Sequence, residues 1–362
     1  MKVIKVKTKP SYEIVIGENL LSFIAEDLPK VCNFGKVAIV SDSKVASLHG
    51  KNLLNVLSAQ GIAAELFTFP EGEASKNIET VVSLARSLLQ RGFDRKDLIM
   101  AFGGGVVGDI AGFLASIYLR GVPYVQVPTT LLAQVDSSVG GKTGVDLPEG
   151  KNLLGTFYQP LKVYIDTSFL KTLPLLEIKN GLSEIIKYGF ALKRNIYTFL
   201  VKRKRNLYEL RAKDMEYLIY HSLLAKAQVV SKDEKEAGLR RALNFGHTIG
   251  HAIEAYSKYK VPHGLAVSVG MAVEAKLSEI LQVNEEPLFK PLKDLLEDLE
   301  LPCKIRDLGI VPKENELLNL LSKDKKVWRG RLTVVLLNGI GRFHFYEDPP
   351  IEAIREAIGA CF

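Results

Sequence analysis

Three histidines stand close together in the stretch NFGHTIGHAIEAYSKYKVPHG. His247 and His251 are separated by four positions, so on a helix both imidazoles project from one face. His263 follows Pro262, a point at which the chain can turn back toward that face. Clustered imidazoles are ligands that a zinc-type ion prefers, and a carboxylate from elsewhere could complete the set. The alternative is that these histidines serve in capping and packing.

A glycine-rich segment follows a short apolar run in LIMAFGGGVVGDIAGF. The run Leu98–Phe102 is typical of a buried strand, and Gly103–Gly105 would let backbone amides approach a ligand closely. A helix after these glycines would present its N-terminus to an anion such as a pyrophosphate. The spacing Gly103-x-Gly105-x-x-Gly108 matches the dinucleotide fingerprint, but Val122–Tyr124 stands where an acidic ribose ligand is expected about 20 positions later. The segment predicts a nucleotide site that differs from an ordinary Rossmann first turn.

A third segment, VPTTLLAQVDSSVGGKTGVDLPEGKNLLGTFYQP, combines glycines with polar side chains. It holds Asp136, Lys142, Lys151 and Asn152. Glycine-rich loops that carry lysines suit a phosphorylated or carboxylated substrate, because lysine supplies a mobile point charge. An ordinary surface loop is the alternative.

Strand-like and helical patterns alternate through the first half of the chain. The expected strands are Val37–Val40, Glu65–Phe69, Leu98–Phe102 and Tyr124–Val127, with helical patterns between them to about Gln60 and over Asn77–Arg91. This alternation predicts a parallel sheet with helices on its faces, and ligands bind such sheets at the loops after the strands. Those loops are Ser41-Asp42, Glu71–Lys76, Gly103–Asp109 and Thr129-Thr130.

The pattern becomes mostly helical from about Leu175, with one β-like exception at Leu332–Leu337. We therefore expect an α/β, Rossmann-like nucleotide-binding domain over residues 1–174. An α-helical domain over residues 175–362, carrying the metal and substrate residues, would follow it.

Composition excludes several classes of protein. The chain has 362 residues of which 47% are hydrophobic, so it can form real cores. No apolar run reaches the roughly 18 residues of a membrane span, and the N-terminus reads as strand, not signal peptide. Three widely spaced cysteines imply no disulfide framework, which favours the cytoplasm. The net charge of +7 is concentrated partly in Lys202–Arg205, which lies in a helical pattern and indicates a solvated helix face, not a nucleic-acid site.

Five motifs, in order and spacing, resemble the 3-dehydroquinate synthase family of sugar phosphate cyclases. They are GGGVVGD, VPTTLLAQVDSSVGGKTGVD, GKNLLGTFYQP, GLSEIIKYG and LNFGHTIGHAIE, and the resemblance extends over essentially the whole chain. It implies a lyase of the shikimate pathway, which leads to the aromatic amino acids, and a dehydroquinate synthase-like fold of two domains. It also implies conversion of 3-deoxy-D-arabino-heptulosonate 7-phosphate into 3-dehydroquinate and phosphate, with NAD⁺ and Zn²⁺ (or Co²⁺) as cofactors. The implied steps are oxidation, phosphate elimination, reduction, ring opening and intramolecular aldol closure, and the NAD⁺ is regenerated.

The resemblance also assigns residues to roles. It gives the metal to Glu184, His247 and His263, and so moves His251 from the metal to the substrate pocket. The implied NAD⁺ contacts are Asp42, Glu71, Gly72, Glu73, Ala74, Ser75, Lys76, Gly105, Val106, Val107, Gly108, Asp109, Thr129, Thr130, Lys142, Lys151, Phe169, Leu170, Lys171 and Thr172. The implied catalytic and substrate residues are Arg120, Asp136, Lys142, Asn152, Lys187, Lys226, Arg240, Asn244, His251 and Lys326.

Other functions remain as alternatives. A metal-dependent polyol dehydrogenase would share the fold and the nucleotide loops, but it gives no reason for so many cationic and amide residues. A sister cyclase that acts on a heptulose phosphate without a carboxylate is nearer, and Arg240 with Asn244 favours the carboxylated substrate. A zinc-bound scaffold would leave an open three-ligand site unused. We expect a small-molecule substrate, no nucleic acid or membrane partner, and a homodimer, the commonest assembly.

Overall fold

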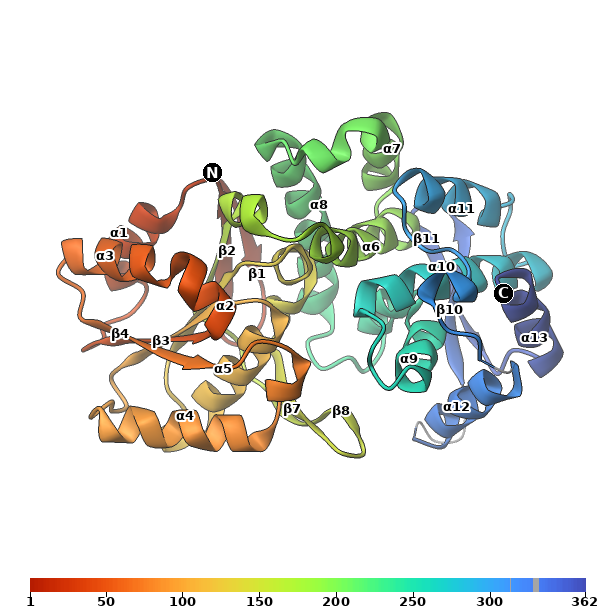
Figure 1. Cartoon of the computed structure of the whole chain (residues 1–362). Coiled ribbons are helices and arrows are strands. Elements are labelled where there is room, and N and C mark those ends of the chain that lie inside the picture. The colour runs from red at the N-terminus through yellow and green to blue at the C-terminus, as the bar shows by residue number, and fades with distance from the viewer. Residues whose placement is uncertain (313, 328–331) are drawn as a thin grey trace. The chain divides into compact units, whose positions relative to one another are not determined.

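The chain forms two compact units (Figure 1). The computed structural model describes residues 1–312, 314–327 and 332–362. The first unit comprises Met1–Leu173 and Met215–Lys235, and the second comprises Pro174–Asp214 and Glu236–Phe362. The boundary between residues 174 and 175 that the sequence suggests stays a prediction.

A seven-stranded sheet forms the centre of the first unit. Its order is β1, β2, β9, β6, β5, β3, β4, and every neighbouring pair is parallel except β1 and β2. The strands are β1 (Lys2–Val6), β2 (Tyr12–Gly17), β3 (Val37–Asp42), β4 (Ala64–Phe69), β5 (Leu98–Gly103), β6 (Tyr124–Pro128) and β9 (Lys162–Asp166). The four strands that the apolar runs predict are confirmed to within two residues at each end.

The order of the strands creates a switch point between β3 and β5. After β3 the chain passes to β4 on one side, and it then crosses back to β5 on the other side. The connections after these two strands therefore run in opposite directions, and α/β sheets bind ligands at the carboxyl ends beside such a switch point. Asp42 ends β3 and Gly103 ends β5, so the sequence motifs lie at this edge.

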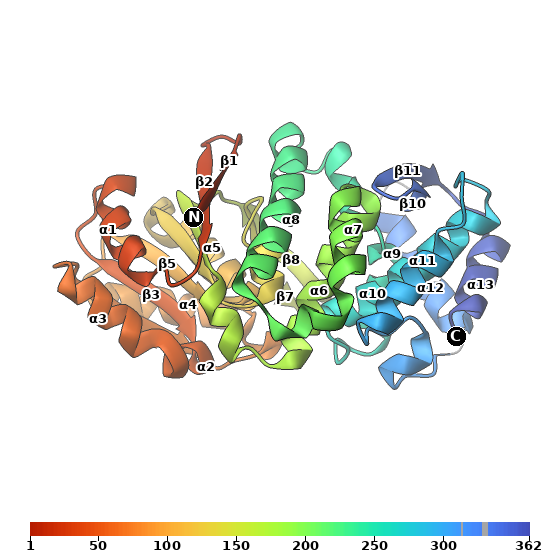
Figure 2. The same ribbon diagram turned by 90° about the horizontal axis from the view of Figure 1, so that it is seen from above.

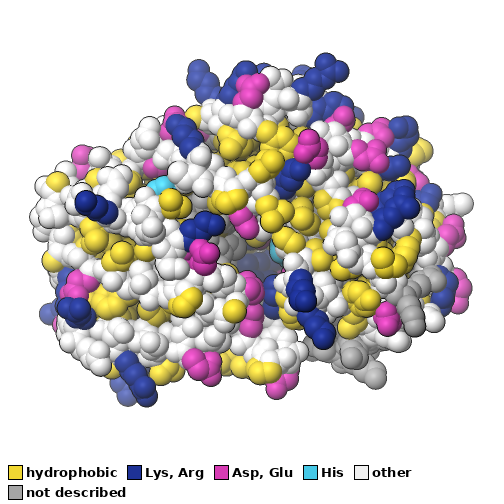
Figure 3. All heavy atoms as spheres, viewed as in Figure 1, with side chains coloured by type: hydrophobic (Ala, Val, Ile, Leu, Met, Phe, Trp, Pro, Cys, Tyr) yellow, Lys and Arg dark blue, Asp and Glu magenta, His cyan; other side chains and the backbone are white. Residues whose placement is uncertain are grey.

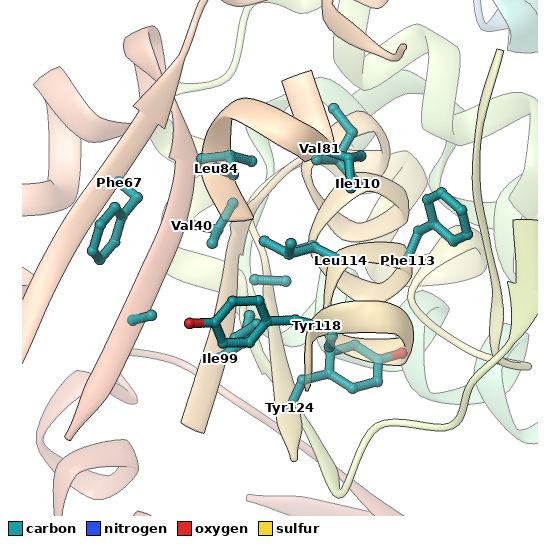
Figure 4. Packing of buried hydrophobic residues seen from close by; sticks show 14 of the residues in the cluster. Val40, Phe67, Val81, Leu84, Ile99, Ile110, Phe113, Leu114, Tyr118 and Tyr124 are labelled. Atoms are coloured by element: carbon teal, nitrogen blue, oxygen red, sulfur yellow. The ribbon is translucent and has the colours of Figure 1, made fainter. Parts of the chain in front are cut away.

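Alternating side chains of the parallel strands fill two cores. On one face, Ile39 and Met100 pack with α1 (Leu21–Val31) and α3 (Lys51–Ala59). On the other, Val40 and Ile99 pack with α4 (Ile78–Gln90) and α5 (Gly105–Ile117), as Figure 4 shows. Because neighbouring residues of a strand point to opposite faces, an unbroken apolar run is what a sheet covered on both sides requires.

Several elements of the first unit are not evident in the sequence pattern. The glycine-rich segment taken as loop forms an antiparallel hairpin of β7 (Lys142–Leu147) and β8 (Gly150–Phe157). A short helix α2 (Ser43–Val45) directly follows β3. Helix α8 (Ala212–Lys232) lies far along the chain, yet most of it belongs to this unit. There the Ser231 hydroxyl accepts from the Lys7 amide and Lys226 pairs with Asp136.

The second unit is mainly helical. Its helices are α6 (Leu175–Ala191), α7 (Arg194–Arg203), α9 (His247–Tyr256), α10 (His263–Ile280), α11 (Phe289–Asp298), α12 (Glu314–Val327) and α13 (Ile351–Ala360). One hairpin, β10 (Thr333–Gly339) with β11 (Arg342–Glu347), accounts for the β-like run expected near its end.

Helix α10 is the central helix of the second unit, and α6, α9, α11, α13 and β10 pack around it (Figure 2). Its buried residues cover all sides of the helix, as expected for an element without a solvent face. Close approach is possible because a Cβ at Gly264 would lie 2.0 Å from the Asn180 carbonyl oxygen of α6. A Cβ at Gly270 would lie 1.9 Å from the carbonyl oxygen of Gly246, just before α9. These two glycines therefore set how near α6 and the start of α9 come to α10.

The basic run behaves as the helical pattern predicts. Lys202 and Arg203 end α7 and are exposed, and Figure 3 shows basic side chains gathered over this region of the surface. Arg203 lies 3.6 Å from Asp214, and Lys204 pairs with Asp298. Among the described residues no helix combines the length and apolar character needed to cross a membrane.

Candidate active site

A carboxylate and two imidazoles meet inside the second unit. Glu184 lies in the middle of α6, while His247 and His263 are the first residues of α9 and α10. Helix α9 ends at Tyr256 and Pro262 precedes α10, so the chain turns back between the two histidines as the proline suggests. The donor atoms of the three residues all lie within 4.8 Å of one another.

The separations suit a tetrahedral ion. His247 Nε2 is 3.6 Å and His263 Nε2 is 3.5 Å from the same oxygen, Glu184 Oε1. Ligands at about 2.0–2.1 Å from a tetrahedral zinc stand roughly 3.4 Å apart. Two nitrogens and one carboxylate are also the donor set of catalytic zinc sites that keep a position open. The residues present therefore fit a zinc or cobalt ion.

The outer nitrogens of both histidines have acceptors. His247 Nδ1 is 3.2 Å from the Phe245 carbonyl oxygen, and His263 Nδ1 is 3.1 Å from Glu254 Oε2. An imidazole that donates from Nδ1 keeps its lone pair on Nε2, the atom that faces Glu184. When neutral, both rings would therefore offer their lone pairs on the side that faces Glu184 Oε1.

Burial and neighbouring charges act differently on the two histidines. Burial, with the charge of Lys187, holds the pKa of His247 well below its usual value. Burial also disfavours the charged form of His263, but hydrogen bonds to Glu184 and Glu254 outweigh it and raise the pKa of His263 to about 10. Glu184 is fully buried and its second oxygen contacts the Lys187 ammonium. In the structure, the positive charges of His263 and Lys187 therefore lie against Glu184, which is where a bound cation would also place positive charge.

Two further carboxylates support the cluster, and the sequence analysis did not identify either. Glu254 faces His263, and Glu274 of α10 accepts a hydrogen bond of 2.6 Å from the Gly246 amide at the start of α9. A carboxylate at a helix N-terminus satisfies amides that have no partner inside the helix. Glu254 ends the LNFGHTIGHAIE motif that contains His247 and His251. This closeness in sequence is the signal that could have identified it.

The other predicted substrate residues of the second unit lie on several elements. Arg240 is buried in the turn Leu239–Asn244, and Asn244 donates to Glu236 at 3.2 Å. His251 is exposed on α9, its ring centroid 5.3 Å from that of His247 and 6.0 Å from that of His263. Lys187, one turn beyond Glu184, is buried against it. Lys326 lies near the end of α12, and its side chain is outside the described part of the chain.

The predicted nucleotide residues of the first unit follow the carboxyl ends of its parallel strands. They come after β3, β4, β5, β6 and β9, and the hairpin β7–β8 supplies Lys142 and Lys151. Asp42 caps α2 by accepting from the Lys44 and Val45 amides at 2.9 Å. The Phe169 ring packs edge-on against Phe102 of β5, with centroids 5.6 Å apart. Loops far apart in sequence therefore share one edge of the sheet.

The glycines in the turn from β5 into α5 lie close to neighbouring side chains. Gly104 precedes α5, and a Cβ there would lie 2.9 Å from Thr130 Cγ2. A Cβ at Gly108 would lie 2.9 Å from Gln126 Oε1 of β6, so Gly108 brings α5 against the sheet. The first amides of α5 have no partner within the helix and point out of its N-terminus. This turn can therefore bind an anion through its backbone.

A buried lysine connects three segments at this edge. Lys76 Nζ lies 2.6 Å from Asp109 Oδ2 and donates to Asn152 Oδ1 at 2.6 Å. Burial opposes the charge of Lys76, but Asp109 outweighs it and raises the pKa of Lys76. Lys151 pairs with Glu73 at 3.0 Å. The β7–β8 hairpin is thus fastened to the loop after β4, which brings predicted substrate and nucleotide residues together.

The remaining predicted residues of the first unit differ in exposure. Lys226 of α8 is buried and donates to both the backbone oxygen and Oδ1 of Asp136 at 2.8 Å. Arg120 and Lys142 are exposed. Arg120 has a positive φ of 70°, which is uncommon for a residue with a side chain and directs the chain into the turn before β6.

The fold and the donor cluster together define the class of the protein, the sugar phosphate cyclases. The structure resembles 2-epi-5-epi-valiolone synthase from Streptomyces hygroscopicus subsp. jinggangensis 5008, solved with NAD⁺ and Zn²⁺ bound. The TM-score is 0.88 at 28% identity, over 97% of this chain and 96% of that one. It also resembles 2-deoxy-scyllo-inosose synthase complexed with carbaglucose-6-phosphate, NAD⁺ and Co²⁺, with a TM-score of 0.87 at 27% identity over 100% of both chains.

The chain belongs to the 3-dehydroquinate synthase family. The model of the family's N-terminal part matches residues 66–180, and that of its C-terminal part matches residues 181–327. A 3-dehydroquinate synthase from Thermodesulfovibrio yellowstonii is 42% identical over 335 residues, which cover 92% of each chain. The family resemblance expected from the five motifs is confirmed.

Proposed function

We propose that this chain converts 3-deoxy-D-arabino-heptulosonate 7-phosphate into 3-dehydroquinate and phosphate, with NAD⁺ and either Zn²⁺ or Co²⁺ as cofactors. The observation that supports this most is the cluster of Glu184, His247 and His263. It supplies an open metal site in a chain whose relatives carry the name of this activity. When bound, the metal would polarise a substrate hydroxyl and NAD⁺ would accept and return a hydride.

The glycine-rich edge of the first unit is our proposed dinucleotide site. The N-terminus of α5 would hold the pyrophosphate, because its backbone amides point outward and no side chain at Gly104 obstructs them. The loops after β3, β4, β6 and β9 would bind the rest of the dinucleotide. The buried Lys76 keeps the loop after β4 and the β7–β8 hairpin together around it.

The basic and amide residues would position a doubly anionic substrate. We assign the phosphate to Lys142, Asn152 and Lys187. Arg240 and Lys226 would serve the carboxylate, because a guanidinium binds both carboxylate oxygens. Lys226 already holds Asp136, so these two act as one unit. Asn244 and His251, which lie in the same unit as the metal ligands, complete the proposed set. Arg120 and Lys326 are also assigned to the substrate.

A sister cyclase that uses a substrate without a carboxylate is the alternative, since two synthases with other names share this fold at 27–28% identity. Arg240 favours the carboxylated substrate, because a guanidinium can bind both oxygens of a carboxylate. A dehydrogenase would also use the two cofactor sites, but it would consume NAD⁺ in proportion to product.

One assay separates these functions. Purified, metal-loaded protein is given the heptulosonate phosphate with NAD⁺ far below the substrate concentration, and phosphate and NADH absorbance are recorded together. We expect one phosphate per substrate, many turnovers per NAD⁺ and no net NADH. NADH rising in step with product would contradict the cyclase function. A preference for a heptulose phosphate without the carboxylate would favour a sister activity.

We further propose that the protein works as a homodimer in the cytoplasm. Twofold dimers are the commonest assembly of soluble proteins, and the three cysteines, all free in the structure, suit a reducing compartment. Light scattering coupled to gel filtration tests the assembly, and a mass of one chain would contradict it.

A further inference from the structure

A buried carboxylate stands behind one of the two histidines of the metal cluster. Glu254, in the second half of α9, is 3% exposed, and its Oε2 lies 3.1 Å from His263 Nδ1. That separation is within the range of a direct hydrogen bond. Because burying a carboxylate is costly, a partner of this kind is what makes its position tolerable.

The His263 imidazole therefore lies between two carboxylates. Its Nε2 faces Glu184 Oε1 at 3.5 Å, and its Nδ1 faces Glu254. A neutral imidazole has one N–H and one lone pair, and the shorter of the two separations favours the N–H on Nδ1, toward Glu254. Donation to Glu254 leaves the lone pair on Nε2, directed at the metal position.

The two histidines differ in this respect. His247 Nδ1 faces a neutral acceptor, the Phe245 carbonyl oxygen, at 3.2 Å. Of the two histidines, only His263 has a carboxylate as the partner of its Nδ1. A hydrogen bond to an ionised group is stronger than one to a carbonyl, and it increases the electron density that the ring offers to a metal.

We propose that Glu254 is a positioning residue that holds His263 in the tautomer and orientation required to ligate the metal. This inference rests on the proposed function, because it presumes the metal site of Glu184, His247 and His263. Glu254 would also oppose part of the charge of a divalent ion, which Glu184, already in contact with Lys187, balances only incompletely.

The same residues suggest a competing arrangement. His251, Glu254 and His263 also bring donor atoms within 4.8 Å, so Glu254 would be a ligand if a second ion bound there. Two ions would require the His263 ring to lose both N–H protons. The hydrogen-bond distance between Nδ1 and Oε2 favours a retained proton, and His251 is exposed. We therefore assign Glu254 as the hydrogen-bond partner of His263 at a site for one ion.

Metal affinity in Glu254→Gln tests the proposal. Zinc affinity is measured by competition with a chromophoric chelator on full-length protein, and metal content is counted by mass spectrometry. We expect one ion per chain in the wild type and a roughly 10- to 100-fold weaker affinity in the variant, the usual effect of losing an outer-shell partner. Glu254→Asp should fall between the two, because it keeps the charge but withdraws it by one methylene.

Two controls separate positioning from a general loss of structure. Glu279→Gln removes another carboxylate, on α10, which accepts from the Leu288 and Phe289 amides at 3.1 and 3.0 Å, and it should leave zinc affinity unchanged. The visible spectrum of the Co²⁺-loaded protein reports ligand geometry. It should change in Glu254→Gln and stay the same in Glu279→Gln, while the far-ultraviolet circular dichroism of both metal-free variants matches that of the wild type.

Each outcome has a distinct meaning. Unchanged zinc affinity with an unchanged cobalt spectrum in Glu254→Gln would overturn the role of Glu254 and leave the metal site intact. Two ions per wild-type chain, with one lost in the variant, would make Glu254 a ligand and overturn the proposal. A wild type that binds no zinc, or binds it as well as His247→Ala does, would overturn the proposed metal site itself.

Discussion

The proposed nucleotide site at the sheet edge of the first unit and the metal cluster of the second unit use different chemical groups. At the edge, the proposed anion site is formed by backbone, namely the amides at the start of α5 beside Gly104. In the cluster, side chains face one another under burial, and Glu184 is wholly inaccessible. A backbone site is affected mainly by substitutions that fill space. A side-chain site depends on the chemistry of each member and on the groups behind it.

Removal of a ligand should have the largest effect. His247→Ala takes away one of three donors, and we expect loss of bound zinc with activity reduced by roughly 10³-fold or more, since a catalytic metal supplies several kcal/mol. Metal content and turnover are measured on the same sample, with circular dichroism as the control for folding. Full, catalytically competent zinc in the variant would remove His247 from the site.

Filling the backbone site should have the next largest effect. Gly104→Val places a branched side chain where a Cβ is already 2.9 Å from Thr130 Cγ2, and it obstructs the approach of a phosphate. We expect NAD⁺ affinity to fall roughly 10- to 100-fold, which corresponds to lost charge-assisted hydrogen bonds of about 1.5–3 kcal/mol. Calorimetry measures it. Gly359→Val, at a glycine of α13 whose Cβ would meet nothing within 4 Å, is the control. Equal affinity in the two variants would place the nucleotide elsewhere.

Arg240 tests whether the side-chain site extends from metal to substrate. Arg240→Ala should lower turnover of the heptulosonate phosphate by at least roughly tenfold, because a charge-assisted pair contributes about 1.5–3 kcal/mol. Arg240→Lys should recover only part of the loss, since lysine lacks the planar fork. Steady-state kinetics give the result, with zinc content as the control. If the alanine variant distinguished the carboxylated from the uncarboxylated substrate as well as the wild type does, Arg240 would not bind the carboxylate.

A last effect, on folding stability and not on binding or turnover, concerns pH and the support of α9. Burial outweighs the amides of Gly246, Ile249 and Thr248 and raises the pKa of Glu274 to about 8. The folded state then holds a proton that the unfolded state loses above about pH 4.3, so this contribution to stability declines as pH rises to 8. Glu274→Gln stays neutral throughout. Metal-free melting curves should show the wild type losing stability relative to the variant from pH 5 to 8, by at most about 1.4 kcal/mol per pH unit. A pH-independent difference would mean that Glu274 does not titrate in this range.

The strand, turn and helix of the proposed backbone site could be predicted from sequence because their signals are local. An apolar run followed by Gly103–Gly105 predicts a strand, a turn and a helix, and the parallel order then places the turn at the ligand-binding edge. The hairpin β7–β8 was missed for a related reason, since its glycines resemble those of a loop. Gly144 and Gly155 instead allow the two strands to approach, as a Cβ at either would lie within 2.6 Å of the opposite backbone.

The side-chain site could be predicted only in part. The spacing of His247 and His251 suggested joint ligands, and the motif resemblance was needed to substitute Glu184 and His263. The structure groups Glu184, His247 and His263 in one cluster. Spacing is informative within one helix, but Glu184 lies on α6, far back in the chain, and packing against α10 brings it near. Glu254 was missed because its partner His263 lies across the turn between two helices, and local periodicity does not describe such a turn.

The place of α8 has a consequence for synthesis of the chain. The segment Met215–Lys235, which contains most of α8, completes the first unit, yet the ribosome makes Pro174–Asp214 of the second unit before it. At roughly 5–20 residues per second, the nascent first unit waits several seconds for the helix that carries Lys226 to Asp136 and Ser231 to Lys7. During that delay the surface that α8 will cover is open to other chains. A fragment that ends at Leu173 lacks α8 and keeps that surface exposed. We therefore expect it to aggregate more than a fragment that extends to Lys235 and contains the helix.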